Sequence, residues 1–134
     1  MNSDVNQASM KVDIILSDGF VMTELSGVVD VLRLANRVVD KKMFTFRYVS
    51  PEAGIVKSSA DTWLNASALS NNPDADIAVF LGNSDLNFTS REIEKAVHKY
   101  RYTNAKVVLL AEAAAIYISA NSDDGFGHTT HWEN

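Results

Sequence analysis

The sequence predicts an α/β domain in which a parallel sheet is covered by helices on both faces. Apolar, β-branched runs alternate along the chain with segments whose apolar residues recur at helical spacing. Such alternation produces right-handed βαβ units and therefore a parallel sheet between two helical layers. The length of 134 residues, with 46% hydrophobic and 22% charged residues, fits one globular domain with its own core.

The first half of the chain contains two predicted strands, one helix and a hairpin. KVDIIL, at 11–16, is mostly apolar, as a buried parallel strand should be. Thr23 is the expected N-cap of the helix that follows. One face of this helix is apolar and consists of Leu25, Val28, Val29, Leu32 and Ala35. FTFRYVS, at 44–50, alternates as a strand, and after the turn PEAG the short segments IVKSS and TWLNAS predict a hairpin-like excursion.

The second half repeats the strand–helix alternation. ADIAVFLG, at 75–82, is the clearest buried strand in the chain. Thr89 and Glu92 have capping-box spacing and open a helix. Its buried face is expected to contain Ile93, Ala96, Val97 and Tyr100, whereas His98 lies off that face and is expected to be solvated. KVVLL, at 106–110, is the last predicted strand, and a helix-forming run at 111–120 follows it directly.

Composition excludes several classes of function. The formal net charge of -5 argues against binding of nucleic acid by this chain itself. The absence of cysteine excludes disulfides, thiolate metal sites and a cysteine nucleophile. No apolar run is long enough to cross a membrane. Residues 1–10 form a polar stretch without a secretory apolar region, so we expect a flexible leader, a domain at 11–134 and a cytoplasmic location.

No cofactor or metal is predicted. The chain contains neither GxGxxG nor GxxxxGK[ST], so nucleotide binding has no support from motifs. His128, His131 and Glu133 could be drawn as a metal cluster near the end of the chain. The two threonines between the histidines favour a strand, however, and on a strand His128 and His131 would point to opposite faces.

The candidate ligand site lies where the strands end, because ligands of such folds bind beyond the carboxyl ends of the strands. The turn at Gly82 and Asn83 could present backbone N–H groups to a ligand, or be an ordinary loop. Glu24 could be an acidic residue of the pocket, or its carboxylate could only interact favourably with the positive end of the helix dipole. Ala111 stands where a strand runs directly into a helix, the turn on which α/β enzymes mount a nucleophile. Glu112 is the only reactive side chain beside it.

With these residues in place, the chain resembles the PfpI-like (class I glutamine amidotransferase-like) domain at the N-terminus of AraC-type transcriptional regulators. The resemblance runs from about Val12 to Trp132. In the first half of the chain it rests on GF followed by ELSG, on LAN, and on YVSPEAG with the two serines after it. In the second half it rests on DIAVFLGN and, in register after the turn at Ala111, on DG and TTHW. The implied fold is a flavodoxin-like, three-layer sandwich. Family members usually continue past TTHW, so a fragment of a longer sensor or a naturally truncated chain is expected.

The resemblance implies a sensor rather than an enzyme. Family members place a Cys-Thr-Gly-Ala elbow where this chain has Ala111, Glu112 and two alanines, and the enzymes pair that cysteine with a carboxylate that matches Glu24. Without the cysteine, no covalent catalysis is implied. We therefore expect a homodimeric domain that binds a small-molecule metabolite through Glu24, Gly82, Asn83, Ala111 and Glu112. DNA would be bound only through a helix-turn-helix domain that is not in this chain.

Three alternatives stay open. A PfpI-like hydrolase or hydratase could use a water activated by Glu24, without a covalent step. The chain could also be a free-standing metabolite-binding domain. A receiver-like signalling domain fits the size, acidity and alternation of the chain, but the acidic pair after the first strand and the later lysine of such domains are missing.

Overall fold

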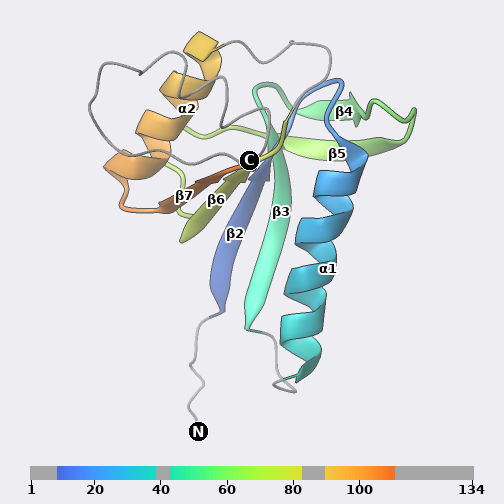
Figure 1. The fold of residues 1–134 in the computed structure, drawn as a ribbon. Coiled ribbons are helices and arrows are strands. Elements are labelled where there is room, and N and C mark those ends of the chain that lie inside the picture. The colour runs from blue at the N-terminus through green and yellow to red at the C-terminus, as the bar shows by residue number, and fades with distance from the viewer. Residues whose placement is uncertain (1–8, 39–42, 83–89, 111–134) are drawn as a thin grey trace, which may run out of the picture.

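The computed structural model describes residues 9–38, 43–82 and 90–110, which form a mainly parallel sheet with helices on either side (Figure 1). The elements follow in the order β2 (Met10–Ile15), α1 (Met22–Val38), β3 (Phe44–Ser50), β4 (Gly54–Lys57), β5 (Trp63–Ala68), β6 (Ile77–Phe80), α2 (Ser90–Tyr102) and β7 (Lys106–Leu109). The sheet has six strands in the order β4-β5-β3-β2-β6-β7. The predicted α/β, flavodoxin-like fold is therefore confirmed.

Parallel pairing brings the strand ends to one edge of the sheet. β2 pairs in parallel with both β3 and β6, and β6 pairs in parallel with β7. β4 and β5 are antiparallel and form the predicted hairpin, which joins the sheet through a parallel pairing of β5 with β3. The carboxyl ends of β2, β3 and β6 are thus neighbours, which is the arrangement that creates a ligand site in open α/β sheets.

The two faces of the sheet carry separate hydrophobic cores. Alternate residues of β2 point to opposite faces, so Ile14 packs with Leu25 of α1 and Ile15 packs on the side of α2. The predicted apolar face of α2 is fully confirmed, since Ile93, Ala96, Val97 and Tyr100 are all buried. His98 is exposed, as expected.

The start of α1 differs from the prediction. The backbone carbonyl of Val21 accepts hydrogen bonds from the N–H groups of Glu24, at 3.1 Å, and Leu25, at 3.2 Å. Val21 therefore precedes the helix, and Thr23 is an exposed residue of its first turn rather than the N-cap. The reason is tertiary, because the N–H of Val21 donates to the carbonyl of Gly82 at 3.2 Å and fixes the backbone just before the helix.

The end of α1 is tied to β3 through Asn36. Its Oδ1 accepts hydrogen bonds from the N–H groups of Met43, at 2.7 Å, and Phe44, at 2.8 Å. Its Nδ2 donates to the carbonyl of Phe44 at 3.0 Å. This explains the asparagine of the LAN segment, since one side chain satisfies three backbone groups where the chain enters β3. The capping box at Thr89 and the helix predicted at 111–120 lie outside the described residues.

Candidate ligand-binding site

The loop between β2 and α1 is held between two other strand ends. On one side the N–H of Gly19 donates to the carbonyl of Lys57 at 2.7 Å, and the N–H of Lys57 donates to Asp18 Oδ1 at 3.0 Å. On the other side the loop contacts Gly82 through Val21, as described above. Gly19 has a φ of 89°, a conformation that residues with a Cβ adopt only with strain. The loop therefore has a backbone fixed by its neighbours.

Glu24 and Gly82 are directly joined at this edge. Gly82, which is buried, donates its backbone N–H to Glu24 Oε1 at 2.7 Å across 58 residues of sequence. The carboxylate sits in the first turn of α1, where the helix dipole also favours negative charge. The side chain of Glu24, which is half-buried, thus holds the backbone in place where the chain leaves β6.

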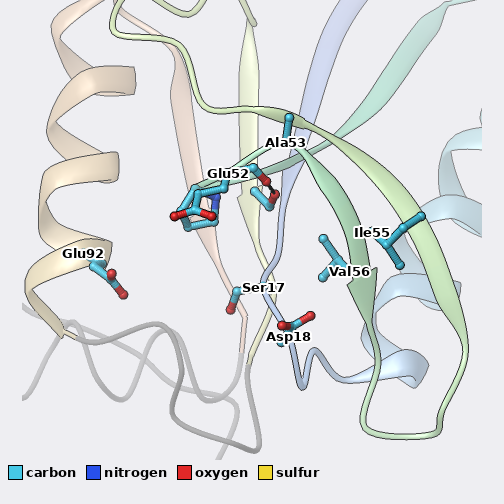
Figure 2. A pocket seen from close by; sticks show the side chains of 9 residues that line it. Ser17, Asp18, Glu52, Ala53, Ile55, Val56 and Glu92 are labelled. Carbon is cyan, nitrogen blue, oxygen red and sulfur yellow. Dashed lines mark hydrogen bonds between the residues drawn. The ribbon is translucent and has the colours of Figure 1, made fainter.

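A hollow of about 250 Å³ lies beside this loop, at the ends of β2 and β3 (Figure 2). Ser17 and Asp18 line it from the loop after β2, and Glu92 lines it from the first turn of α2. The remaining lining residues come from the end of β3 and from β4: Ser50, Pro51, Glu52, Ala53, Ile55 and Val56. The position at the carboxyl edge of the sheet is the one expected for a ligand.

The lining combines buried hydroxyls with carboxylates. Ser17 and Ser50 are buried, and Ser50 Oγ donates to the carbonyl of Glu52. Figure 2 shows Asp18, Glu52 and Glu92 spread around the hollow rather than stacked at one point. Three carboxylates around a small hollow create a negative potential, which favours a neutral or cationic molecule over an anion.

The structure brings together only part of the predicted site. Glu24 and Gly82 are in contact, but neither is among the residues that line the hollow. Asn83, Ala111 and Glu112 lie outside the described residues, as do His128, His131 and Glu133. The end of β3 and Glu92 were not predicted as parts of the site. The sequence did contain a signal for the end of β3, because the turn PEAG directly follows the strand predicted at 44–50. Ligands bind beyond the carboxyl ends of parallel strands, so this turn was also a candidate.

A second polar cluster lies within the sheet and not at its edge. Asp13, in the middle of β2, accepts a hydrogen bond from Arg47 Nε at 2.8 Å and another from the hydroxyl of Tyr100 at 2.7 Å. Burial raises the pKa of Tyr100 far above its usual value, and the hydrogen bond to Asp13 adds to this. The same carboxylate raises the pKa of Arg47 by hydrogen bonding. The cluster ties α2 to β2 and β3, because Tyr100 and Arg47 both donate to the one buried carboxylate of Asp13.

The described residues contain neither a membrane-spanning helix nor a cluster of metal-binding side chains. No helix among residues 9–38, 43–82 and 90–110 is long and apolar enough to cross a bilayer. Within the same ranges, histidine and acidic side chains do not gather in groups of three or more that could hold a metal ion.

The fold is similar to that of α/β domains of the DJ-1 superfamily. The chain superposes on a DJ-1 superfamily protein from Agrobacterium tumefaciens with a TM-score of 0.69 and 19% identity, over 92% of this chain and 65% of that one. A cysteine-to-alanine mutant of a DJ-1 superfamily protein from Salmonella typhimurium gives a TM-score of 0.68 and 22% identity, over 84% and 61% of the two chains.

Within that class, the chain is similar to an AraC family transcriptional regulator from Pseudomonas putida. The TM-score is 0.76 and the identity 25%, over 92% of this chain and 68% of that chain. No family model matches the sequence, and no curated protein sequence matches it. The structural neighbours confirm the resemblance that the sequence motifs indicated, to the PfpI-like domain of AraC-type regulators. The chain spans roughly two thirds of the length of each of these three proteins.

Proposed function

We propose that this chain is a non-catalytic, small-molecule-sensing domain of an AraC-type transcriptional regulator. The observation that carries the proposal is the likeness to the Pseudomonas putida regulator, which covers 92% of the chain at 25% identity. The hollow at the ends of β2 and β3 supports it, because a sensor needs a concave site of its own. The alanine at position 111 supports it further, since the nucleophile of the related enzymes has no counterpart there.

The proposed mechanism is a population shift. A metabolite bound at the carboxyl edge stabilises one arrangement of the domain and its dimer partner, and a DNA-binding module in the same protein then responds. Glu24, Gly82, Asn83, Ala111 and Glu112 remain our proposed pocket residues, extended by Asp18, Glu52 and Glu92 around the hollow. A cytoplasmic location belongs to the same proposal, because a transcriptional regulator acts where its DNA is.

The acidic lining narrows the class of ligand. Asp18, Glu52 and Glu92 all contribute negative charge to a hollow of about 250 Å³, so an anionic metabolite would have to overcome like-charge repulsion. We expect a small neutral or amine-bearing molecule, held by the carboxylates and by backbone groups of the loop after β2.

A thermal-shift screen of neutral, cationic and anionic metabolites tests the proposal, with titration calorimetry on each hit. Loss of binding is expected in Glu52→Gln and Glu92→Gln if the hollow is the site, and in Glu24→Ala and Ala111→Leu if the ligand extends to the predicted elbow. Tyr102→Ala is the matched control, since Tyr102 is 84% exposed on α2 and does not line this hollow. Hits that bind all four variants like the unaltered chain would overturn the pocket assignment.

An enzyme is the second candidate, favoured by one observation. Glu24 Oε1 accepts a hydrogen bond from the N–H of Gly82 at 2.7 Å, which fixes the carboxylate at the carboxyl edge of the sheet, where it could activate a water molecule. The DJ-1 fold is compatible with such a role, but the proposed sensor needs no turnover. Hydrolase and hydratase assays on the unaltered chain and on Glu24→Gln separate the two. Turnover that disappears in Glu24→Gln would replace the sensor proposal, and turnover that survives would remove Glu24 as its basis.

A further inference from the structure

A second concave surface lies away from the hollow, on the side of the sheet that α2 covers. It is a groove of about 700 Å³ between the C-terminal half of α2 and the segment that leads from β5 to β6 (Figure 1). This volume lies in the range of small-molecule sites. The lining residues are Asn71 and Asn72 from that segment and His98, Lys99, Arg101 and Tyr102 from α2.

Both walls of the groove are held in place by the fold. Ala75 and Tyr100 are buried in the same hydrophobic cluster, so the segment after β5 packs on the same core as α2. The N–H of Asn72 donates to Ser70 Oγ at 3.0 Å, which fixes the bend that carries the two asparagines. At the end of α2, Thr103 Oγ1 donates to the carbonyl of Tyr100 at 3.0 Å. The walls are therefore positioned before a ligand binds, which lowers the cost of binding.

The groove is cationic, although the chain has a formal net charge of -5. Lys99 and Arg101 supply positive charge, and none of the described residues that line the groove is acidic. Among the described residues, neither of these cations belongs to an ion pair. Asp74, the next acidic residue after the two asparagines, is paired with Lys11 at 2.9 Å. The groove thus favours an anion, whereas the hollow with its three carboxylates does not.

The helix dipole explains the cations of the groove but not its other residues. Lys99 and Arg101 are in the last turn of α2, where positive charge interacts favourably with the negative end of the dipole. That interaction needs neither an aromatic ring nor amides. Tyr102 is nevertheless 84% exposed and lines the groove beside the cations, and two asparagines line it from the other wall. Charge, ring and amides together indicate a binding site.

These three features match the parts of a nucleoside phosphate. Guanidinium and ammonium groups donate charge-assisted hydrogen bonds to phosphate oxygens. An exposed tyrosine ring offers a face on which a base stacks. An asparagine amide carries both a donor and an acceptor, the pattern that reads the edge of adenine. An acidic peptide would be attracted by the cations alone, so it leaves the ring and the amides without a role.

We propose that the groove between α2 and the segment after β5 binds a nucleoside phosphate. The phosphate lies at Lys99 and Arg101, and the base stacks on Tyr102. Adenine is the base that Asn71 and Asn72 suit best. The nucleotide motifs that the sequence lacks bind phosphate at a helix N-terminus, whereas this groove lies along the C-terminal half of α2.

The proposal does not rest on the sensor function. Glu92 lines the hollow and Tyr102 lines the groove, and these residues are ten positions apart on α2, which is roughly 15 Å along a helix. The two sites also prefer ligands of opposite charge. Each can therefore be tested without the other.

Titration calorimetry of the 134-residue chain with ADP, adenosine and inorganic phosphate tests the proposal. ADP is expected to bind with a dissociation constant between about 10 and about 500 μM, as suits an open groove. Adenosine lacks the charge and inorganic phosphate lacks the base, so each should bind at least about tenfold more weakly. The proposal is overturned if ADP does not bind at up to about 1 mM, or if phosphate binds as tightly as ADP.

Three variants locate the ligand in the groove. Arg101→Gln should weaken ADP binding about tenfold, because a charged donor is lost. Tyr102→Ala should weaken it about tenfold or more, whereas Tyr102→Phe keeps the stacking face and should stay within about threefold of the unaltered chain. Arg33→Gln, the same change at an exposed position of α1, is the control. Equal affinity in Arg101→Gln and Arg33→Gln, or unchanged binding by Tyr102→Ala, excludes the groove as the site.

A comparison of bases tests the asparagines. UDP should bind about fivefold more weakly than ADP, because uracil does not offer the donor and acceptor pattern of adenine. Asn72→Ala should reduce this difference and leave the binding of UDP unchanged. Equal affinities for ADP and UDP in the unaltered chain would contradict the assigned role of the asparagines.

Two further titrations separate the site from the hollow and identify the source of the nucleotide. Glu52→Gln alters the hollow and should leave ADP binding unchanged, so a loss of ADP binding in this variant would place the nucleotide in the hollow and overturn the proposal. A single strand of six deoxyadenylates that competes with ADP and binds at least about tenfold more tightly identifies a nucleic-acid strand as the source. Weaker binding of the strand identifies the free nucleotide.

Discussion

The hydroxyl of Tyr100 donates a hydrogen bond to Asp13 Oδ2 at 2.7 Å, which links α2 to an interior strand of the sheet. Both residues are buried, and Arg47 supplies the positive charge that the carboxylate needs, with Nε at 2.8 Å from Oδ1. The side chain of Asp13 is only 3% exposed, whereas that of Arg47 is 47% exposed. A buried carboxylate of this kind stabilises the fold only while its partners are present.

Removal of the Tyr100 hydroxyl should therefore destabilise the domain. We expect Tyr100→Phe to lower the free energy of unfolding by about 1.5 to 3 kcal/mol, because a hydrogen bond to a charged group is lost and a buried oxygen keeps only its longer contact with Arg47. Urea unfolding followed by circular dichroism measures the change. Tyr102→Phe, at a highly exposed position on the same helix, should leave the midpoint unchanged.

The stability of the domain should also decrease at alkaline pH because of Tyr100. Burial and the Asp13 carboxylate raise the pKa of Tyr100 in the folded state above its unfolded value. The neutral form is thus favoured by folding, so this contribution is complete below pH of about 10 and decreases as the pH rises further. Urea midpoints at about pH 8 and about pH 11 should differ more for the unaltered chain than for Tyr100→Phe. An equal loss in both proteins would exclude Tyr100 as the cause.

Loss of the hydrogen bond between Gly82 and Glu24 should lower the stability of the domain more than loss of the Thr23 side chain. Glu24→Ala leaves the buried N–H of Gly82 without its acceptor, so we expect a loss of about 1 to 3 kcal/mol of unfolding free energy. Glu24→Gln keeps an acceptor oxygen and should lose less. Thr23→Ala should change stability by less than about 0.5 kcal/mol, because Thr23 does not cap the helix. A larger loss in Thr23→Ala than in Glu24→Ala would restore Thr23 as the cap.

Asn36 should be required where α1 meets β3. Asn36→Ala removes three hydrogen bonds to backbone groups of Met43 and Phe44 at once, so we expect a loss of about 2 to 4 kcal/mol. Asn71→Ala, at an exposed bend, provides the same chemical deletion without those contacts. Thermal unfolding of both variants at equal protein concentration checks this, and equal melting temperatures would be inconsistent with the role of Asn36.

Replacement by alanine should have opposite effects on the stability of the domain at Gly19 and at Gly27. Gly19 has a φ of 89°, so Gly19→Ala strains the loop that holds the site and should cost about 1 kcal/mol or more. Gly27 is helical, and a Cβ added there would meet nothing within 4 Å, so Gly27→Ala should stabilise the domain by about 0.5 to 1 kcal/mol. Urea unfolding of both variants and of the unaltered chain, at the same protein concentration, gives both values. The same sign for both changes would refute the conformational argument.

The local elements were largely predictable because each follows from a short periodic pattern. The strand at 44–50 was predicted with its observed bounds, and the apolar faces of both helices follow from their spacing alone. Burial of Leu25, Ile93 and Tyr100 needs only the rule that one helix face packs on a sheet. The motifs also indicated the family resemblance, because they occur along this chain in the same order as in the family.

Long-range contacts were decided only by the tertiary structure. No local pattern in the sequence pairs Asp13 with Tyr100, or Glu24 with Gly82, since the hydrogen bonds that join them span 87 and 58 residues respectively. The end of β3 became part of the candidate site because parallel pairing with β2 places Ser50 near Ser17. The apolar residues Val31, Leu34 and Val38 can be read from the sequence of α1, but only the fold shows that their side chains are exposed among the described residues. The sequence by itself determined the secondary-structure elements and their order, because these depend on neighbours along the chain. The tertiary structure decided which residues form the candidate site and which side chains are exposed, because these depend on neighbours in space.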